Sequence, residues 1–170
     1  MFRVFLGLGS DVGDRLGLLR RAVEAIKGFA SVTAVSSVYE TEPVGMDDPR
    51  PFYNVAVEIR TGLGPRELMG TLQGIERALG RRDRTHLRPR EIDIDILLVE
   101  GLVHTDDALS VPHPVMDHRR FVLEPLAEIA GDTVHPITQR TVREMLERCD
   151  DPSSVVRTNH TVTSLYADED

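Results

Sequence analysis

The stretch that decides the fold runs from residue 88 to residue 98 and reads Arg88-Pro89-Arg90-Glu91-Ile92-Asp93-Ile94-Asp95-Ile96-Leu97-Leu98. From Glu91 onward, polar and apolar residues alternate, a pattern that predicts a β-strand. Because side chains two apart on a strand face the same way, Asp93 and Asp95 share one face and the isoleucines pack on the other. Neighbouring carboxylates repel each other, so this face either holds a divalent cation such as Mg²⁺ or is a solvated acidic surface.

Arginines are concentrated just before the acidic strand, since residues 77–90 contain six arginines and only one aspartate. The planar guanidinium group of arginine is well suited to phosphate oxygens. Carboxylates on a metal ion beside arginines on phosphates are typical of phosphoryl transfer, where positioning and charge neutralisation carry the catalysis. The pattern favours that chemistry, and the alternative is a solvated basic loop that pairs with an acidic surface.

The composition is that of an ordinary soluble domain, with 170 residues, 41% hydrophobic and 28% charged. No apolar run approaches the roughly 18 residues of a membrane span, and the apolar segment that ends at Gly7 is too short for a signal peptide. The single cysteine, Cys149, excludes an internal disulfide, so we expect a cytoplasmic protein. A net charge of −8 argues against nucleic-acid binding.

The N-terminal segment predicts a buried strand at residues 2–8. Gly7-Leu8-Gly9 is interpreted as a tight turn from this strand into a helix, because no Gly-Lys-Ser/Thr follows to make a phosphate-binding loop. Apolar residues at helical spacing continue to residue 29, and Ser10 or Asp11 is the expected N-cap.

The rest of the chain supplies further elements with recognisable boundaries. Pro65 suits the first turn of a helix and Gly80 a helix stop. The predicted elements are strands at 32–39 and 52–60, a helix at 65–79, the acidic strand, a hairpin that begins near Leu102, an extended segment at 109–114, and helices at 121–129 and 141–149.

This order predicts an α+β fold with a ferredoxin-like βαββαβ core and a mixed C-terminal extension. Both helices of the core should cover one face of an antiparallel sheet and leave the other face free for a site. We expect a single domain at residues 1–150 and a loose, polar tail at residues 151–170.

Two aromatic residues and a histidine are candidate ligand contacts. Phe52 and Phe121 can sandwich a flat heterocycle whose edge Asn54 reads, although ordinary core packing is the alternative for both rings. His113 lies between two prolines, and its fixed backbone suits a phosphate donor as well as a structural role. The long loop with three prolines at residues 41–51 is typical of functional loops.

Several motifs, taken in order, resemble one known family. They are Gly7-Leu8-Gly9-Ser10-Asp11-Val12-Gly13-Asp14, Tyr39-Glu40-Thr41-Glu42-Pro43-Val44-Gly45, Phe52-Tyr53-Asn54, Gln73-Gly74-Ile75-Glu76, Arg88-Pro89-Arg90-Glu91-Ile92-Asp93-Ile94-Asp95-Ile96, and Val111-Pro112-His113 followed by Arg119 and Phe121. From about Val4 to about Leu146 the chain resembles the 6-hydroxymethyl-7,8-dihydropterin pyrophosphokinases of the folate pathway.

The resemblance implies a diphosphotransferase that moves pyrophosphate from ATP to the pterin hydroxymethyl oxygen with the help of two Mg²⁺ ions. It implies metal ligation by Asp93 and Asp95, and catalytic roles for these two aspartates together with Arg81 and Arg90. The implied ATP-binding residues are Gln73, Glu76, Arg81, Arg90, Ile96, Ser110, His113 and Arg119. The implied pterin-binding residues are Thr41, Pro43, Val44, Phe52, Asn54, Asp93 and Phe121.

Other function classes remain to be separated from this one. We expect a monomer that binds these small molecules, with neither a nucleic-acid nor a membrane partner. A catalytically silent nucleotide- or metal-binding module is one alternative. A small RNA-binding module is another, which the aromatic content of 5% and the negative net charge disfavour.

Overall fold

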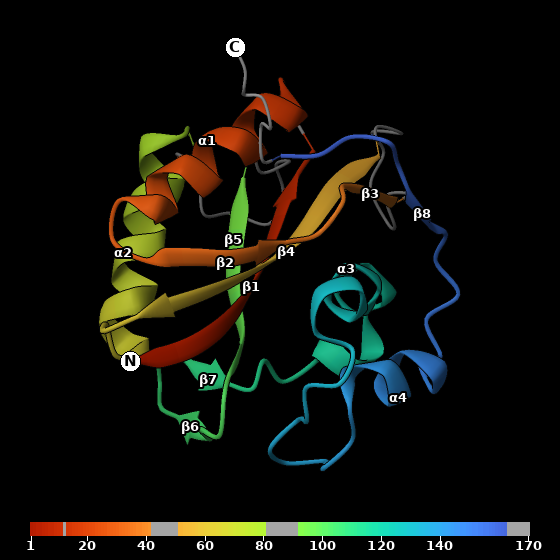
Figure 1. Cartoon of the computed structure of the whole chain (residues 1–170). Helices are drawn as coiled ribbons and strands as arrows, with labels where there is room; N and C mark the ends of the chain where they lie inside the picture. The colour runs from red at the N-terminus through yellow and green to blue at the C-terminus, as the bar shows by residue number, and fades with distance from the viewer. Residues whose placement is uncertain (12, 42–50, 81–91, 163–170) are drawn as a thin grey trace.

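The computed structural model describes residues 1–11, 13–41, 51–80 and 92–162 (Figure 1). Its elements in chain order are β1 (Phe2–Ser10), α1 (Arg15–Lys27), β2 (Ser31–Val35), β3 (Tyr39–Thr41), β4 (Phe52–Thr61), α2 (Pro65–Ala78), β5 (Asp93–Val99), β6 (His104–Thr105), β7 (Ser110–Val111), the 3-10 turn η1 (Met116–His118), α3 (Arg120–Ala130), α4 (Val142–Glu147) and β8 (Val155–Arg157).

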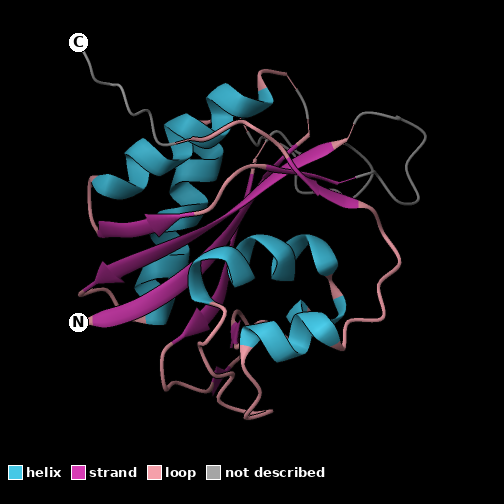
Figure 2. Ribbon diagram, turned by 45° about the vertical axis from the view of Figure 1, so that its right-hand side comes forward, coloured by secondary structure: helices cyan, strands magenta, loops and turns pink. Residues whose placement is uncertain are grey.

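Within these ranges the strands form one six-stranded antiparallel sheet and a small β6–β7 hairpin. The strand order is β5-β1-β4-β3-β8, and β2 also pairs with β4. Helices α1 and α2 cover one face of the sheet, while α3 and α4 lie on the other (Figures 1 and 2). The α+β class and the antiparallel sheet predicted from the sequence are confirmed.

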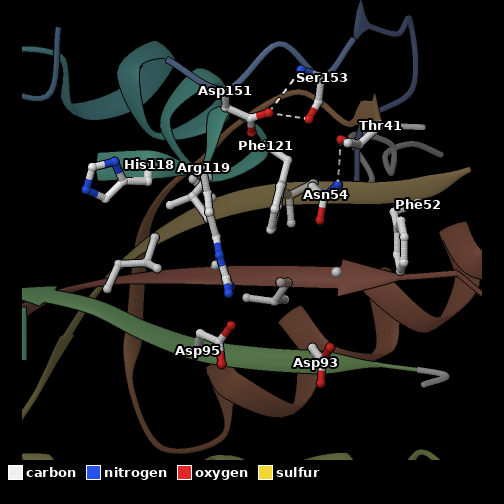
Figure 3. A pocket seen from close by; sticks show the side chains of 17 residues that line it. Thr41, Phe52, Asn54, Asp93, Asp95, His118, Arg119, Phe121, Asp151 and Ser153 are labelled. Carbon is white, nitrogen blue, oxygen red and sulfur yellow. Dashed lines mark hydrogen bonds between the residues drawn. The ribbon is translucent and has the colours of Figure 1, made fainter. Parts of the chain in front are cut away.

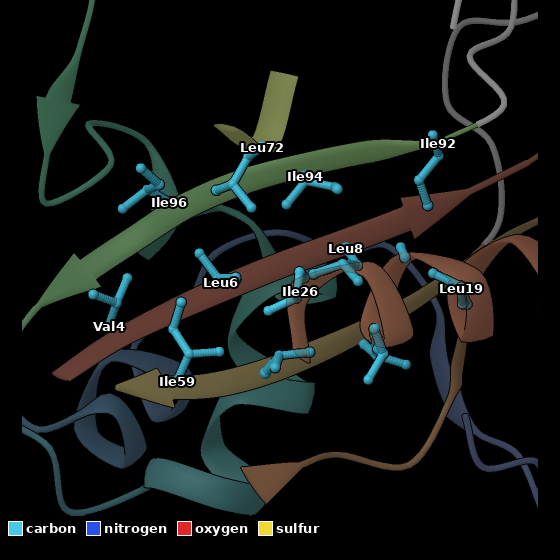
Figure 4. Packing of buried hydrophobic residues seen from close by; sticks show 14 of the residues in the cluster. Val4, Leu6, Leu8, Leu19, Ile26, Ile59, Leu72, Ile92, Ile94 and Ile96 are labelled. Atoms are coloured by element: carbon cyan, nitrogen blue, oxygen red, sulfur yellow. The ribbon is translucent and has the colours of Figure 1, made fainter. Parts of the chain in front are cut away.

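The main core lies between the sheet and helices α1 and α2 (Figure 4). The alternation predicted for the acidic strand is confirmed, because Ile92, Ile94 and Ile96 are buried in this core. The helix predicted from Pro65 is also confirmed, with Gly64 at its N-cap and Pro65 in its first turn. No helix among the described residues is long and apolar enough to cross a membrane.

Three local predictions are wrong, two between β1 and α1 and one at residues 32–39. Gly7-Leu8-Gly9 is not a turn but part of β1, because β4 and β5 hydrogen-bond to this strand on both sides up to Gly9. The N-cap of α1 is Asp14, whose carboxylate accepts a hydrogen bond of 3.0 Å from the amide of Gly17.

The single strand predicted at residues 32–39 is divided into β2 and β3. Between them, the hydroxyl of Ser36 accepts a hydrogen bond of 2.9 Å from the amide of Ala56. A side chain here takes the place of a backbone carbonyl, so the regular ladder with β4 is interrupted.

The prediction of a loose tail is wrong for residues 151–162. Val155–Arg157 forms β8, which pairs with the outer edge of β3. Farther on, Thr158 donates hydrogen bonds from its amide and hydroxyl to the carbonyl of Val38, and Val162 is buried in the main core. These contacts depend on a distant strand edge, which local sequence patterning does not reveal.

The second face of the sheet is not wholly free, contrary to expectation. Leu123 and Leu126 of α3 pack against Phe5, Ala56 and Leu97 and bury the middle of this face. Among the described residues, the end of the sheet where β1 finishes and β4 and β5 begin is left uncovered by this packing, and the candidate site lies there.

Candidate active site

A cavity of about 600 Å³ lies at this open end of the sheet, beneath the first turn of α3 (Figure 3). The strands β1, β4 and β5 form its floor, and η1, α3 and the segment after α4 form its walls. Its lining residues are Gly7, Leu8, Gly9, Thr41, Phe52, Asn54, Val55, Ala56, Asp93, Asp95, Leu97, His118, Arg119, Phe121, Val122, Asp151 and Ser153.

The register of the sheet determines which polar residues lie side by side on the floor of the cavity. Gly9 of β1 lies opposite Asn54 of β4 on one side and Asp93 of β5 on the other. An added Cβ at Gly9 would lie 2.9 Å from the Asn54 Oδ1 atom, closer than such contacts allow. The glycine therefore leaves a flat gap between an amide that can read a ligand edge and a carboxylate that can hold a metal ion.

Asn54 is held in one orientation by its neighbour on β3. Its Nδ2 donates a hydrogen bond of 2.9 Å to the Thr41 hydroxyl, and both residues are buried. This bond fixes the Oδ1 atom over Gly9, where it can accept from a ligand. Phe52 and Phe121 lie on either side of Asn54 in Figure 3, which fits the predicted sandwich for a flat ring.

The two aspartates project from β5 into the cavity, as the alternation predicted. Their strand is the edge of the sheet, and its outward amide at Ile94 donates a hydrogen bond of 2.7 Å to the Glu76 carboxylate of α2. Glu76 is buried, so this bond is a rigid tie between α2 and the strand that carries both aspartates.

Basic groups lie across the cavity from the aspartates. Arg119 extends toward Asp95 in Figure 3, and its guanidinium carbon lies 5.8 Å from the centre of the Phe121 ring. A cation in this position can neutralise an anionic ligand while it packs on the aromatic wall.

His113 lies next to these groups, although it is not part of the cavity lining. Burial lowers the pKa of its imidazole, and Arg119 lowers it further against the opposing attraction of Asp95. The Nδ1 atom accepts a hydrogen bond of 3.4 Å from the amide of Val115, so the neutral ring carries its proton on Nε2. That N–H is available as a donor to a phosphate oxygen.

Comparison with known proteins identifies the family to which this chain belongs. A model described as 7,8-dihydro-6-hydroxymethylpterin-pyrophosphokinase matches residues 5–131. The chain belongs to this pyrophosphokinase family. The family predicted from the motifs is confirmed.

The sequence relatives include 2-amino-4-hydroxy-6-hydroxymethyldihydropteridine pyrophosphokinases from two bacteria. The Bacillus subtilis protein is 49% identical over 127 residues, which is 74% of this chain and 76% of the relative. The Methylorubrum extorquens protein is 44% identical over 159 residues, which is 92% of this chain and 99% of the relative. The folic acid synthesis protein fol1 of Pneumocystis carinii is 37% identical over 147 residues, covering 85% of this chain but 20% of its own length.

A solved structure supports the fold. The chain resembles the Plasmodium falciparum HPPK-DHPS protein crystallised with pteroate, with a TM-score of 0.73 and 15% sequence identity. The match covers 86% of this chain and 44% of the Plasmodium chain, so this chain spans less than half of that protein.

The donor set of the cavity fits the magnesium chemistry expected of a pyrophosphokinase. No group of three His, Cys, Asp or Glu side chains in the described ranges could hold a metal ion by itself. Asp93 and Asp95 nevertheless supply two hard carboxylates on one face, and Mg²⁺ is usually bound by one or two carboxylates together with substrate phosphates. The site therefore fits an ion that arrives with a nucleotide.

The structure brings only some of the family-implied residues to the cavity. Thr41, Phe52, Asn54, Asp93, Arg119 and Phe121 line it, as does Asp95. Gln73 and Ser110 are half-buried and lie outside the cavity lining, and the side chain of Ile96 is buried in the core on the opposite face. Pro43, Val44, Arg81 and Arg90 lie outside the described residues.

Sequence reasoning missed several residues of the cavity. Gly7 and Gly9 had a signal, because they alternate with Leu6 and Leu8 and so belong to the face opposite the core. Asp151 and Ser153 had none, since only the distant contacts of the C-terminal segment bring them to the cavity.

Proposed function

We propose that this cavity transfers the pyrophosphoryl group of ATP to the hydroxymethyl oxygen of 6-hydroxymethyl-7,8-dihydropterin. The products are AMP and the pterin diphosphate, and the step belongs to folate biosynthesis. Membership of the pyrophosphokinase family and the names of the relatives support this reaction. The observation that carries it at the level of atoms is the position of Gly9 between Asn54 and Asp93.

The pterin ring occupies the space between Phe52 and Phe121. A flat, electron-poor heterocycle gains from stacking on two aromatic faces, and Asn54 reads its polar edge through an oxygen that Thr41 keeps in place. Its hydroxymethyl group then points along the glycine floor toward β5, where the phosphates lie. Thr41, Pro43 and Val44 complete the pterin site.

Asp93 and Asp95 would hold two Mg²⁺ ions that arrive with the nucleotide. Such ions neutralise a triphosphate and polarise the oxygens that bind them. The role of Glu76 is to hold β5 through the Ile94 amide, so that neither carboxylate drifts from the cavity face. The resemblance assigns Glu76 to the nucleotide site. We propose that Glu76 contributes to that site indirectly, by holding β5 in place.

Positive and neutral donors bind the phosphates from the other side. Arg119 supplies a charge above the aspartates, and His113 donates from Nε2 because its other nitrogen is occupied. Arg81 and Arg90 are assigned to the same phosphates, and Gln73, Ile96 and Ser110 to the nucleotide. Catalysis then follows from alignment and charge neutralisation rather than from a covalent intermediate.

Further properties belong to the same proposal. We infer a ferredoxin-like core, supported by the order β5-β1-β4 with β2 next to β4, in a single pyrophosphokinase domain that comprises the predicted residues 1–150 together with the segment up to residue 162, which pairs with β3 and reaches the main core. We also infer a cytoplasmic monomer that binds these two small molecules and no nucleic acid.

The experiment that tests the function is an assay of AMP release. Purified protein with Mg²⁺ and ATP is compared with and without reduced 6-hydroxymethylpterin. Pterin-dependent AMP that disappears when Mg²⁺ is chelated is the expected result. Release of ADP would assign simple phosphoryl transfer instead, and a folded protein that binds ATP without making either product would be a silent binding module.

A further inference from the structure

The first turn of α3 is poorly stabilised by its own sequence, although it carries two residues of the cavity. The N-cap, Arg119, makes no side-chain capping bond. Pro125 lies inside the helix and has no amide hydrogen, so the carbonyl of Phe121 receives no bond from four residues later. Something outside the helix must hold this turn in place.

The missing cap comes from the C-terminal segment. The Asp151 Oδ2 atom accepts a hydrogen bond of 2.9 Å from the amide of Arg120, the first residue of α3. In return, the Arg120 side chain donates from Nε to the Asp151 carbonyl at 3.0 Å and from Nη2 to the Cys149 carbonyl at 3.2 Å. We call these reciprocal bonds the Asp151–Arg120 clamp.

The clamp lies directly beside the functional groups. Arg119 and Phe121 flank Arg120 in sequence and both line the cavity, and Asp151 lines it as well (Figure 3). Farther along the same segment, β8 pairs with β3, so the clamp is anchored on both sides. The match to the family model ends at residue 131, so it does not include this segment.

The carboxylate of Asp151 is already occupied, which distinguishes a positioning role from a catalytic one. Its Oδ1 atom accepts hydrogen bonds from the amide of Ser153, at 2.9 Å, and from the Ser153 hydroxyl. With Oδ2 bound to the Arg120 amide, no oxygen is left without a donor. Such a group acts through the residues that it holds.

We infer that Asp151 is a positioning residue that orients Arg119 and Phe121 for pterin binding and phosphate alignment. The inference rests on the proposed function for its kinetic readout. Residues 151–162, which the sequence predicted to be a loose tail, are therefore part of the active-site scaffold. They act on the cavity through the Asp151–Arg120 clamp.

The test uses the full chain and four variants: Asp151→Ala, Asp151→Asn, Ser153→Ala and the control Asp132→Ala. Asp132 is a matched aspartate that pairs with an arginine, Arg143, on the exposed surface. The KM for reduced pterin and kcat are measured by AMP release, and pterin affinity is measured by calorimetry. Asp151→Ala should raise the KM and the dissociation constant about tenfold, the size of a lost charge-assisted bond. Asp151→Asn should recover part of this loss because it keeps an acceptor oxygen, and the control should match the wild type.

A double-mutant cycle separates positioning from a general loss of stability. In a Phe121→Ala background, adding Asp151→Ala should change pterin affinity less than twofold, because the ring that Asp151 orients is gone. The same tenfold effect in both backgrounds would overturn the inference, and so would an Asp151→Ala protein that behaves like the control.

Two further outcomes keep the test decisive. If Asp151→Ala fails to fold, Asp151→Asn and Ser153→Ala should each weaken pterin binding about threefold, and wild-type affinity in both would refute the clamp. If the wild type releases no AMP, the proposed function fails, whereas the pterin titrations of the same variants still decide whether Asp151 positions the site.

Discussion

The side-chain amide of Asn54 donates a hydrogen bond of 2.9 Å to the hydroxyl of Thr41 on the neighbouring strand. This single bond decides which way the Asn54 amide faces, and therefore whether its oxygen or its nitrogen meets a ligand above Gly9.

Replacing Thr41 with valine tests that relationship at nearly constant volume. The variant leaves a buried N–H without its acceptor, which costs about 1–3 kcal/mol and frees the amide to turn. We expect the KM for pterin to rise about tenfold, with the affinity for ATP unchanged. Thr105→Val is the control, since Thr105 is exposed on β6, and equal pterin KM values in the two variants would count against an orienting role.

Gly9→Ala tests the glycine floor. The added methyl group would meet the Asn54 Oδ1 atom at 2.9 Å, so that side chain must shift out of the cavity. We expect kcat/KM for pterin to fall at least about tenfold. Gly70→Ala is the matched control because Gly70 lies on α2 with no atom within 4 Å of the new carbon. It should be active, and more stable by about 0.5–1 kcal/mol. Full activity of Gly9→Ala would show that the floor needs no glycine.

Glu76→Ala tests the tie between α2 and β5. The amide of Ile94 loses its buried acceptor, and we expect the free energy of unfolding in urea to fall by about 1–3 kcal/mol. The concentration of Mg²⁺ that gives half-maximal activity should also rise, because the strand that carries both aspartates is released. Glu24→Ala, which removes only an exposed pair with Lys27, should stay within about 0.5 kcal/mol of the wild type. A drop in stability with unchanged Mg²⁺ dependence would assign Glu76 to the fold alone.

Asp93→Asn and Asp95→Asn test the proposed ion site. Each variant keeps the size of the side chain but loses a charge that a divalent cation needs. We expect turnover to fall at least about a hundredfold in either variant while the thermal midpoint stays near that of the wild type. Near-normal turnover in either variant, measured at saturating Mg²⁺ by AMP release, would remove that carboxylate from the metal site.

His135 should make stability depend on pH. Burial lowers the pKa of its imidazole against the attraction of Asp117, and Nδ1 accepts bonds of 3.2 Å from the amides of Ile137 and Thr138. Because the folded pKa is depressed, the unfolded chain binds more protons. The stabilisation is complete above the ordinary histidine pKa of about 6.5 and is lost as the pH falls below it.

Urea unfolding at pH 7 and pH 5 measures this dependence. The wild type should lose stability between the two values, and His135→Asn should lose less because one of the groups that takes up protons is gone. Equal losses in the two proteins would show that His135 does not contribute to the pH dependence.

The sequence was most informative where local pattern and burial coincide. The alternation around Asp93 and Asp95 predicted that the isoleucines pack in the core and that the two aspartates share the opposite face of β5, and both predictions are confirmed. In Pro65–Ala78 the apolar spacing predicted a helix, which the structure also shows. These elements are specified by the periodicity of their own side chains.

The errors lie where distant segments decide the outcome. Gly7-Leu8-Gly9 has the composition of a turn, but it is a strand because β4 and β5 both hydrogen-bond to it. At Ser36, between β2 and β3, the amide of Ala56 on a distant strand donates to the hydroxyl instead of to a backbone carbonyl. Asp151 carries no local mark of its role, because the N-terminus of α3 that it caps lies 31 residues earlier in the chain. The arginine-rich segment at residues 81–91 lies outside the described residues, so its assigned roles stay predictions.

The pairing of β8 with β3 also has a consequence for the nascent chain during synthesis. A ribosome makes residues 151–162 after every other described residue, yet these residues cover the outer sheet edge and cap the helix beside the cavity. A nascent chain that lacks them has a bare strand edge, the kind of surface on which other chains add. A nascent chain that ends before Asp151 therefore lacks both the strand that covers the edge of β3 and the carboxylate that caps α3 beside the cavity.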